Sequence, residues 1–154
     1  MGPTTVRTDA IYVDPSALRS LYLHDARSRA MARWRQRHRA ALPVTHHGRV
    51  ELVNSLSLAV FRGDIKPAVL DGALADLEDD FASGRLTRAD VPWRKALDRA
   101  AALSLSFTGR LGTRTLDVLH VACALELGCA VLVTYDERQA ALARAVDLRV
   151  ASPK

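Results

Sequence analysis

The stretch Ala130-Val-Leu-Val-Thr134 decides the fold of this chain, because it is a continuous apolar run typical of a central strand in a parallel sheet. A second buried strand is predicted at Ala10-Ile-Tyr-Val-Asp14, a β-branched and apolar run that ends at an Asp-Pro pair. Pro15 fits the first position of a helix. Each strand is therefore expected to lead directly into a helix.

The remainder of the chain continues this alternation of strands and helices. Apolar residues at helical spacing predict two helices within residues 16–39 and one helix in each of the segments 48–62, 67–84, 92–107, 113–127 and 137–146. Short strands are predicted within residues 42–46, 86–91 and 148–151. The sequence thus predicts an α/β protein, a three-layer α/β/α domain with a central parallel sheet of four to five strands.

Some details of these helices are also predicted. The apolar repeats place Val50 and Leu97 on buried helix faces. The stretch from Gly109 to Gly112 is expected to interrupt the helical structure. His46 and His47 follow a predicted strand, where a ligand or acid role competes with a role in a turn. The turn role is favoured because adjacent residues point in different directions.

Composition limits the class of protein. A chain of 154 residues with 49% hydrophobic content is expected to form one domain, residues 10–154, preceded by an N-terminal extension, residues 1–9. The formal charge of +5 favours a polyanionic partner such as nucleic acid. Cys123 and Cys129 have neither metal-site nor redox spacing, which indicates a reduced, cytoplasmic protein. Neither a signal peptide nor a membrane span is indicated.

Four acidic residues stand where the predicted topology brings them together. Asp14 and Asp136 follow two strands, and ligands of parallel sheets bind beyond the carboxyl ends of the strands. Glu51 and Asp117 are expected in the first turns of helices that begin on the same side. Four carboxylates in one pocket repel one another unless a cation is bound. Oxygen ligands alone favour Mg²⁺, with Mn²⁺ as a substitute, and the chemistry that follows is phosphodiester hydrolysis.

At this point the chain resembles the PIN-domain nucleases and, within them, the VapC-type toxins of bacterial toxin–antitoxin pairs. The matching motifs are Tyr12-Val-Asp-Pro-Ser-Ala-Leu18, Arg49-Val-Glu51, Arg114-Thr-Leu-Asp-Val-Leu-His-Val-Ala122 and Val133-Thr-Tyr-Asp-Glu-Arg-Gln139. The resemblance implies a Mg²⁺-dependent endoribonuclease that acts on RNA, with a cognate antitoxin as partner, and a homodimer or a toxin–antitoxin hetero-oligomer. It also implies that these four acids are metal ligands and catalytic residues, and that Ser16 and Thr134 are polar supports.

Two further residues of these motifs have open roles. Arg114 is expected to contact the acids or the substrate phosphate, or to orient Asp117 by a hydrogen bond. His120 lies three residues after Asp117 and therefore near its face of the helix. A buried, hydrogen-bonded histidine is favoured over a catalytic one.

Ordinary structural roles compete with each functional interpretation. Asp14 and Asp136 are each suited to cap a helix, and Glu51 and Asp117 to a helix's first turn. Only the convergence of the four acids favours a metal site over these roles. The basic segment around Trp34 suggests that RNA binds Arg29, Arg33 and Arg37, which are spaced to share one helix face. A solvated helix with Trp34 in the core is the favoured alternative.

Other functions compete with the nuclease. A catalytically silent PIN-like scaffold that binds RNA or protein is the principal alternative, although all four acids are present. A phosphotransfer domain also places an aspartate after its first strand, but this chain lacks an acidic pair before Asp14 and has no aspartate at position 16. Dinucleotide binding is disfavoured because no GxGxxG motif follows a strand.

Overall fold

The computed structural model describes residues 10–154, so the predicted N-terminal extension lies outside the described residues. The strands are β1 (Ile11–Val13), β2 (Leu42–Val44), β3 (Leu86–Arg88), β4 (Val131–Val133) and β5 (Arg149–Ala151). The helices are α1 (Pro15–Arg19), α2 (Ser28–Arg37), α3 (His46–Phe61), α4 (Pro67–Ala82), α5 (Trp93–Leu103), the π-helix η1 (Ser104–Thr108), α6 (Gly109–Leu111), α7 (Thr115–Glu126) and α8 (Glu137–Ala145). All predicted strands are present. In the described part of the chain, none of the helices is both long and apolar enough to cross a membrane.

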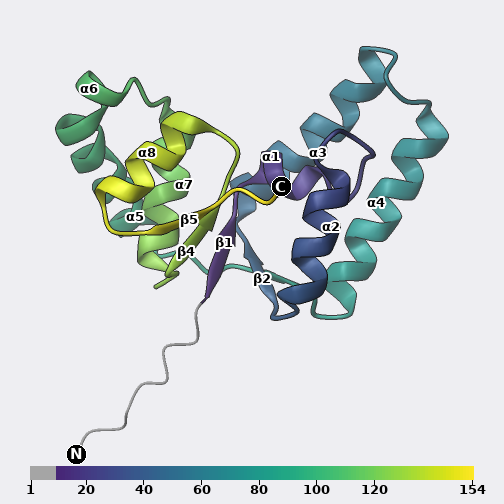
Figure 1. The fold of residues 1–154 in the computed structure, drawn as a ribbon, viewed down its shortest axis with the longest axis horizontal. Coiled ribbons are helices and arrows are strands. Elements are labelled where there is room, and N and C mark those ends of the chain that lie inside the picture. Colours follow the sequence, from purple (N-terminus) through teal and green to yellow (C-terminus); the bar gives the residue numbers. More distant parts are fainter. Residues whose placement is uncertain (1–9) are drawn as a thin grey trace, which may run out of the picture.

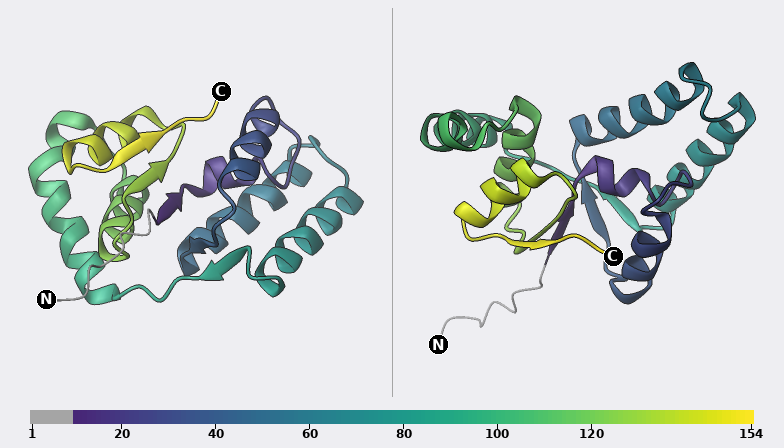
Figure 2. Two further views of the ribbon diagram at one scale, coloured as in Figure 1. Left: turned by 60° about the horizontal axis from the view of Figure 1, so that its bottom comes forward. Right: turned by 45° about the horizontal axis from the view of Figure 1, so that its top comes forward.

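The helices form two groups on opposite sides of the strands (Figures 1 and 2). Helices α1 to α4 pack around one hydrophobic core, and α5, α7 and α8 around another. Side chains alternate between the two faces along a strand. Accordingly, Tyr12 and Leu132 belong to the core of α5, α7 and α8, while Val13 and Val133 belong to the core of α1 to α4. The predicted three-layer α/β/α arrangement is confirmed.

The strands are parallel, but their hydrogen bonding divides them. One group has the order β1-β4-β5 and the other consists of β2 and β3. Strands β1 and β2 lie side by side (Figure 1), yet within residues 10–154 no ladder joins them. The backbone groups of Leu42 and Val44 form hydrogen bonds with the β3 segment, so the backbone of Pro43, between them, faces β1. Proline has no N–H to donate. The predicted single sheet is therefore interrupted between β1 and β2.

Helix α3 begins earlier than the sequence suggested. Thr45 is its N-cap, and its Oγ1 accepts a hydrogen bond from the Gly48 N–H at 3.0 Å. His46 and His47 are consequently the first residues of the helix, and the predicted turn role for them is wrong. Glu51 lies in the second turn rather than the first.

Two other predictions about the helices are corrected. Gly109 does not interrupt helical structure: η1 leads directly from α5 into α6, and only Gly112, with φ +68°, is left-handed and ends the run. Val50 and Leu97 are 66% and 54% exposed rather than buried. The buried face of α3 lies on the opposite side of the helix from Val50, and it carries Leu52, Leu56 and Ala59. An apolar residue at helical spacing does not by itself identify which face is covered.

Candidate active site

The carboxyl ends of β1 and β4 place two of the acids at one edge of the sheet. The strands are parallel neighbours with Val13 opposite Val133, so both end at the same level. The Asp14 N–H extends this pairing by donating to the Val133 carbonyl at 2.9 Å. Asp136 follows β4 at the start of α8. The predicted proximity of Asp14 and Asp136 thus follows from strand pairing.

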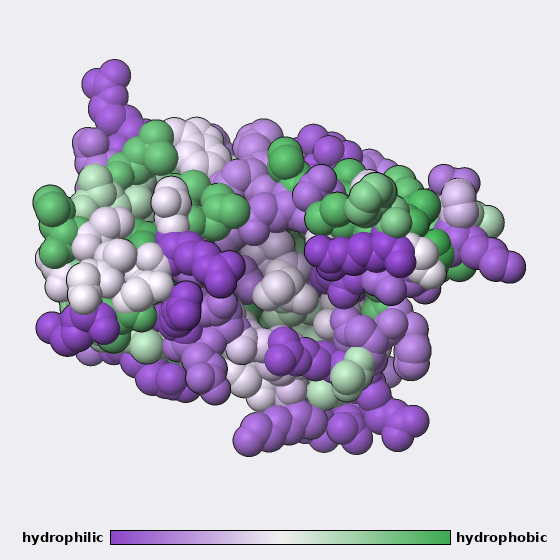
Figure 3. All heavy atoms as spheres, turned by 90° about the horizontal axis from the view of Figure 1, so that it is seen from above, coloured by the Kyte–Doolittle hydropathy of each residue, from purple (hydrophilic) through white to green (hydrophobic). Residues whose placement is uncertain are grey.

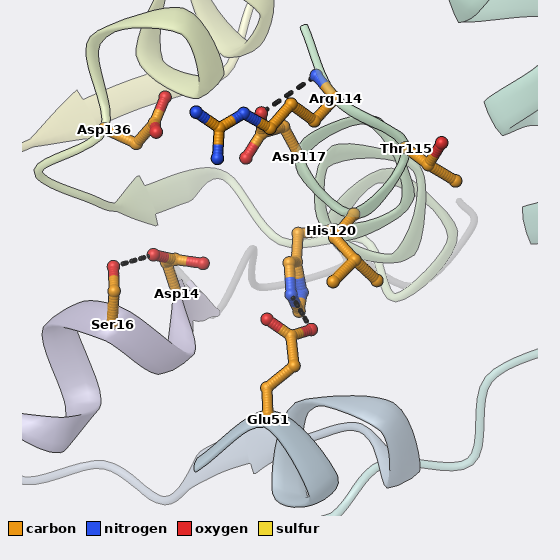
Figure 4. A pocket seen from close by; sticks show the side chains of 9 residues that line it. Asp14, Ser16, Glu51, Arg114, Thr115, Asp117, His120 and Asp136 are labelled. Carbon is orange, nitrogen blue, oxygen red and sulfur yellow. Dashed lines mark hydrogen bonds and ion pairs between the residues drawn. The ribbon is translucent and has the colours of Figure 1, made fainter. Parts of the chain in front are cut away.

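A pocket opens at this edge, between the two groups of helices. Figure 3 looks onto this side of the molecule and shows a hollow bordered by hydrophilic residues. Figure 4 shows the pocket side chains, which come from the β1 end, α3, α7 and the β4 end. Its lining residues are Asp14, Ser16, Glu51, Arg114, Thr115, Leu116, Asp117, His120 and Asp136. All four predicted acids therefore line one pocket.

Asp14 is the most enclosed of these acids, with 6% exposure. Its Oδ2 accepts a hydrogen bond from the Ser16 hydroxyl, and its Oδ1 lies 3.5 Å from the Gln139 side-chain amide nitrogen. The side chain makes no capping bond to α1, so the capping interpretation of Asp14 is wrong. Burial raises the pKa of Asp14, and the nearby Glu51 adds to this effect, against the opposing influence of His120 and of the hydrogen bonds from Ser16 and Gln139.

Asp136 is exposed and does cap a helix. Its Oδ1 accepts a hydrogen bond from the Gln139 backbone N–H at 2.8 Å. The Asp136 N–H in turn donates to Thr134 Oγ1 at 3.1 Å. Thr134 is completely buried and does not line the pocket. Its hydroxyl therefore supports the site only by holding the Asp136 backbone. Capping engages one carboxylate oxygen and leaves other lone pairs for a ligand.

Asp117 lies in the first turn of α7, as predicted, and is held by the residue that precedes the helix. The Arg114 backbone N–H donates to Asp117 Oδ2 at 3.0 Å. Arg114 itself is exposed, and its side chain reaches over Asp117 toward Asp136 in Figure 4. The backbone N–H of Arg114 therefore orients Asp117, which is one of the roles left open for this residue. Its guanidinium lies at the edge of the pocket.

Glu51 is directed to a histidine rather than to the three aspartates. Its Oε1 lies 2.7 Å from His120 Nε2, and His120 Nδ1 lies 2.6 Å from the Tyr12 hydroxyl. His120 is 1% exposed, which confirms the prediction of a buried, hydrogen-bonded residue. Across residues 10–154, the residues found with three donor atoms within 4.8 Å of one another are His47, Glu51 and His120. The three aspartates line the same pocket at wider spacing.

The basic face of α2 lies away from this pocket. Arg29, Arg33 and Arg37 are exposed, and none of them lines the pocket. Trp34 is only 9% exposed and stacks on His38, with ring centroids 4.7 Å apart. It belongs to the core of α1 to α4, so its suggested role in base stacking is wrong and the alternative of a core tryptophan on a solvated helix is confirmed.

Comparison with known families identifies the domain. The PIN domain family matches residues 11–145. This chain belongs to the PIN domain family. PIN domains are generally nucleases and typically depend on a divalent metal. Among solved structures, the crystal structure of PAE2754 from Pyrobaculum aerophilum is similar, with a TM-score of 0.60 and 20% identity over 97% of this chain and 91% of that chain. This likeness concerns the fold alone. No curated protein gives a significant match.

Three residues around the site of this PIN domain have contacts that the sequence did not predict. Gln139 fits a capping box in the sequence, but its side chain also faces Asp14. Tyr12 has no predicted role of its own, and for His47 a turn role is favoured over a ligand or acid role. Tyr12 precedes Asp14 by two residues on β1, and His47 precedes Glu51 by one helical turn, so only the spacing from a known acid pointed to them.

Proposed function

We propose that this PIN domain is a metal-dependent endoribonuclease that hydrolyses RNA phosphodiester bonds. More specifically, we propose that it is the toxin of a VapBC-type pair, neutralised by a cognate antitoxin. The observation that carries the proposal is the convergence of Asp14, Glu51, Asp117 and Asp136, from four separate elements, on one pocket in a PIN fold. Helix-end roles account for Asp136, which caps α8, and for Asp117, whose carboxylate accepts the N–H of the α7 N-cap residue, but they do not explain why all four acids meet in one pocket.

The donor set of this pocket suits Mg²⁺ or Mn²⁺. All four side chains offer carboxylate oxygens, which hard divalent cations prefer. Mg²⁺ keeps several of its waters and uses one or two carboxylates directly, so the wide spacing of the aspartates fits ligation in part through water. The enclosed Asp14 carboxyl, whose pKa is raised by burial, would also be stabilised in its charged form by a cation. We assign Asp14 and Asp117 as the principal ligands, with Asp136 and Glu51 completing the set.

When bound, the cation would supply Lewis-acid stabilisation of the phosphate and a lower pKa of the attacking water. The chain's own groups then have separate tasks. The Ser16 hydroxyl and the Gln139 amide hold Asp14 in position, and the Arg114 backbone N–H holds Asp117. The Arg114 guanidinium at the pocket edge is suited to pair with a phosphate oxygen. A carboxylate not engaged as a direct ligand accepts the proton of the water.

The net charge of the chain supports an RNA partner. The formal charge of +5 favours approach of a polyanion. Large apolar side chains are strongly exposed, with Phe61 at 88% and Leu105 at 90%. Phe61 ends α3 and Leu105 lies in η1, and single exposed apolar side chains are ordinary on a protein surface. We therefore propose the antitoxin complex, and a homodimer or hetero-oligomer, from the family resemblance alone.

The test is cleavage of total bacterial RNA by the purified protein in Mg²⁺, in Mn²⁺ and in EDTA. We expect metal-dependent fragments from the wild type and from Asp71→Asn, an exposed α4 carboxylate outside the pocket, and none from Asp14→Asn. Thermal unfolding of both variants shows that they are folded. Equal cleavage by folded Asp14→Asn would refute the assignment of the site. No cleavage by any folded protein would favour the silent scaffold that binds RNA or protein.

A further inference from the structure

A second group of side chains able to bind a metal overlaps the acidic pocket, because Glu51 and His120 also line that pocket. His47 and Glu51 are four residues apart in α3, which places them on one face of the helix, one turn from each other. His120 comes from α7 on the opposite side. Donor atoms of the three residues lie within 4.8 Å of one another. Tetrahedral ligands at about 2.1 Å from an ion are ~3.4 Å apart, so small side-chain rotations suffice to close the group around one.

The ring nitrogens of His47 are both buried, and neither has a hydrogen-bond partner in the structure. The ring packs against His120, with centroids 4.6 Å apart, and against the edge of Trp93 at 5.3 Å. A buried polar nitrogen without a partner costs free energy. A cation on the Glu51 side of this ring would satisfy one of the two nitrogens.

His120 is oriented as a metal-binding histidine usually is. Such residues bind through one ring nitrogen while the other is hydrogen-bonded to an oriented partner. Here Nε2 points at Glu51 and Nδ1 is held by the Tyr12 hydroxyl at 2.6 Å. Without an ion, the Nε2–H of His120 donates a hydrogen bond to the Glu51 carboxylate, and the Tyr12 hydroxyl donates one to Nδ1. With an ion on Nε2, Nδ1 would carry the proton and donate a hydrogen bond to the Tyr12 oxygen. A hydroxyl serves both states.

We infer that His47, Glu51 and His120 form a transition-metal site that shares Glu51 with the carboxylate site, and that Zn²⁺ is the ion that fits it best. Two imidazoles and one carboxylate are a frequent zinc set, and three protein ligands leave one coordination position open. The aspartates Asp14, Asp117 and Asp136 offer oxygen only and suit harder ions. Glu51 is common to both sites, so zinc binding draws this carboxylate away from the aspartates. Zinc binding itself does not depend on nuclease activity.

The experiment is a titration of the metal-stripped full chain with Zn²⁺ by calorimetry, repeated with Co²⁺ to record its visible absorption. We expect one tightly bound Zn²⁺ per chain and the intense visible bands of Co²⁺ in a four-coordinate site. His47→Gln should lower the affinity at least tenfold. His46→Gln, at the neighbouring exposed histidine of the same helix turn, should bind as the wild type does. Tyr12→Phe should weaken binding about tenfold, as loss of such an outer partner typically does.

Asp14→Asn separates this inference from the nuclease proposal, because it alters the carboxylate site and leaves the three zinc ligands in place. We expect it to bind Zn²⁺ with unchanged affinity, whether or not the wild type cleaves RNA. The inference is overturned if His47→Gln binds Zn²⁺ as tightly as the wild type, or if Asp14→Asn loses as much affinity as His47→Gln. Circular dichroism of each variant establishes that a lost affinity is not a lost fold.

Discussion

Asp136 offers a way to separate helix capping from catalysis at one residue. Its Oδ1 accepts the Gln139 N–H at 2.8 Å and caps α8, and no other side-chain cap of that helix is present among the described residues. Replacing an N-cap aspartate by alanine costs about 1 kcal/mol, whereas asparagine caps as well as aspartate does. For a chain of this size, 1 kcal/mol corresponds to a shift of about 2–4 °C in Tm. Asp136→Ala should therefore lower Tm by about that amount, and Asp136→Asn should leave it nearly unchanged.

The two variants should behave alike in RNA cleavage, because both remove the negative charge that the proposed metal site needs. We expect each to lose most activity in Mg²⁺, although only one of them is destabilised. The assays are thermal unfolding and RNA cleavage on the same preparations. If Asp136→Asn cleaved as the wild type does, Asp136 would be only a cap. If Asp136→Ala unfolded at the wild-type temperature, the magnitude assigned to the cap would be wrong.

Two further predictions concern the start of α3. Gly48→Ala would place a Cβ 2.8 Å from Thr45 Oγ1 and disturb the cap, so urea unfolding should show a loss of about 1–3 kcal/mol. In a Thr45→Ala background the same change should be neutral or stabilising, and a loss of equal size there would contradict this explanation. Burial, and to a lesser degree His120, lowers the pKa of His47 to about 4, below its ordinary value of 6.5. Between these two pH values the unfolded chain binds more protons than the folded chain, so in EDTA the free energy of unfolding should fall as pH falls from about 6.5 to 4. His47→Gln should lose less stability over that range. An equal pH dependence of the two proteins would contradict this explanation.

The fold was predictable where a local sequence pattern also determines how distant segments pair. The apolar runs at β1 and β4 are buried on both faces, so their sequence alone indicates central parallel strands, and their parallel direction brings Asp14 and Asp136 to one edge. The true start of α3 was also encoded, since Thr45 is a good N-cap residue. It was missed because two histidines after a strand resemble a turn.

Other features depend on packing between elements that are distant in the chain. The contact of Glu51 with His120 joins residues 69 positions apart, and no periodicity within α3 or α7 specifies it. The exposure of Val50 and Leu97 depends likewise on which helix face packs against the neighbouring helices. Gly109 continues a helix because its backbone is right-handed there, a choice that glycine leaves to its surroundings.

Pro43 has a mechanical consequence for the site. Within the described residues, β1 and β2 share no backbone ladder. The two parts of the sheet are therefore joined there by side chains, and no backbone hydrogen bonds fix the position of one strand along the other. Glu51 lies in α3, which directly follows β2. Asp14 and Asp136 instead follow β1 and β4, which are joined by a backbone ladder. A slide along this boundary would change the distance from Glu51 to the aspartates without breaking a backbone hydrogen bond, so the hydrogen bonds between Glu51 and His120 and between His120 and Tyr12 of β1 hold that distance. Within the described residues, the width of the pocket therefore depends on side chains at a boundary that no backbone ladder crosses.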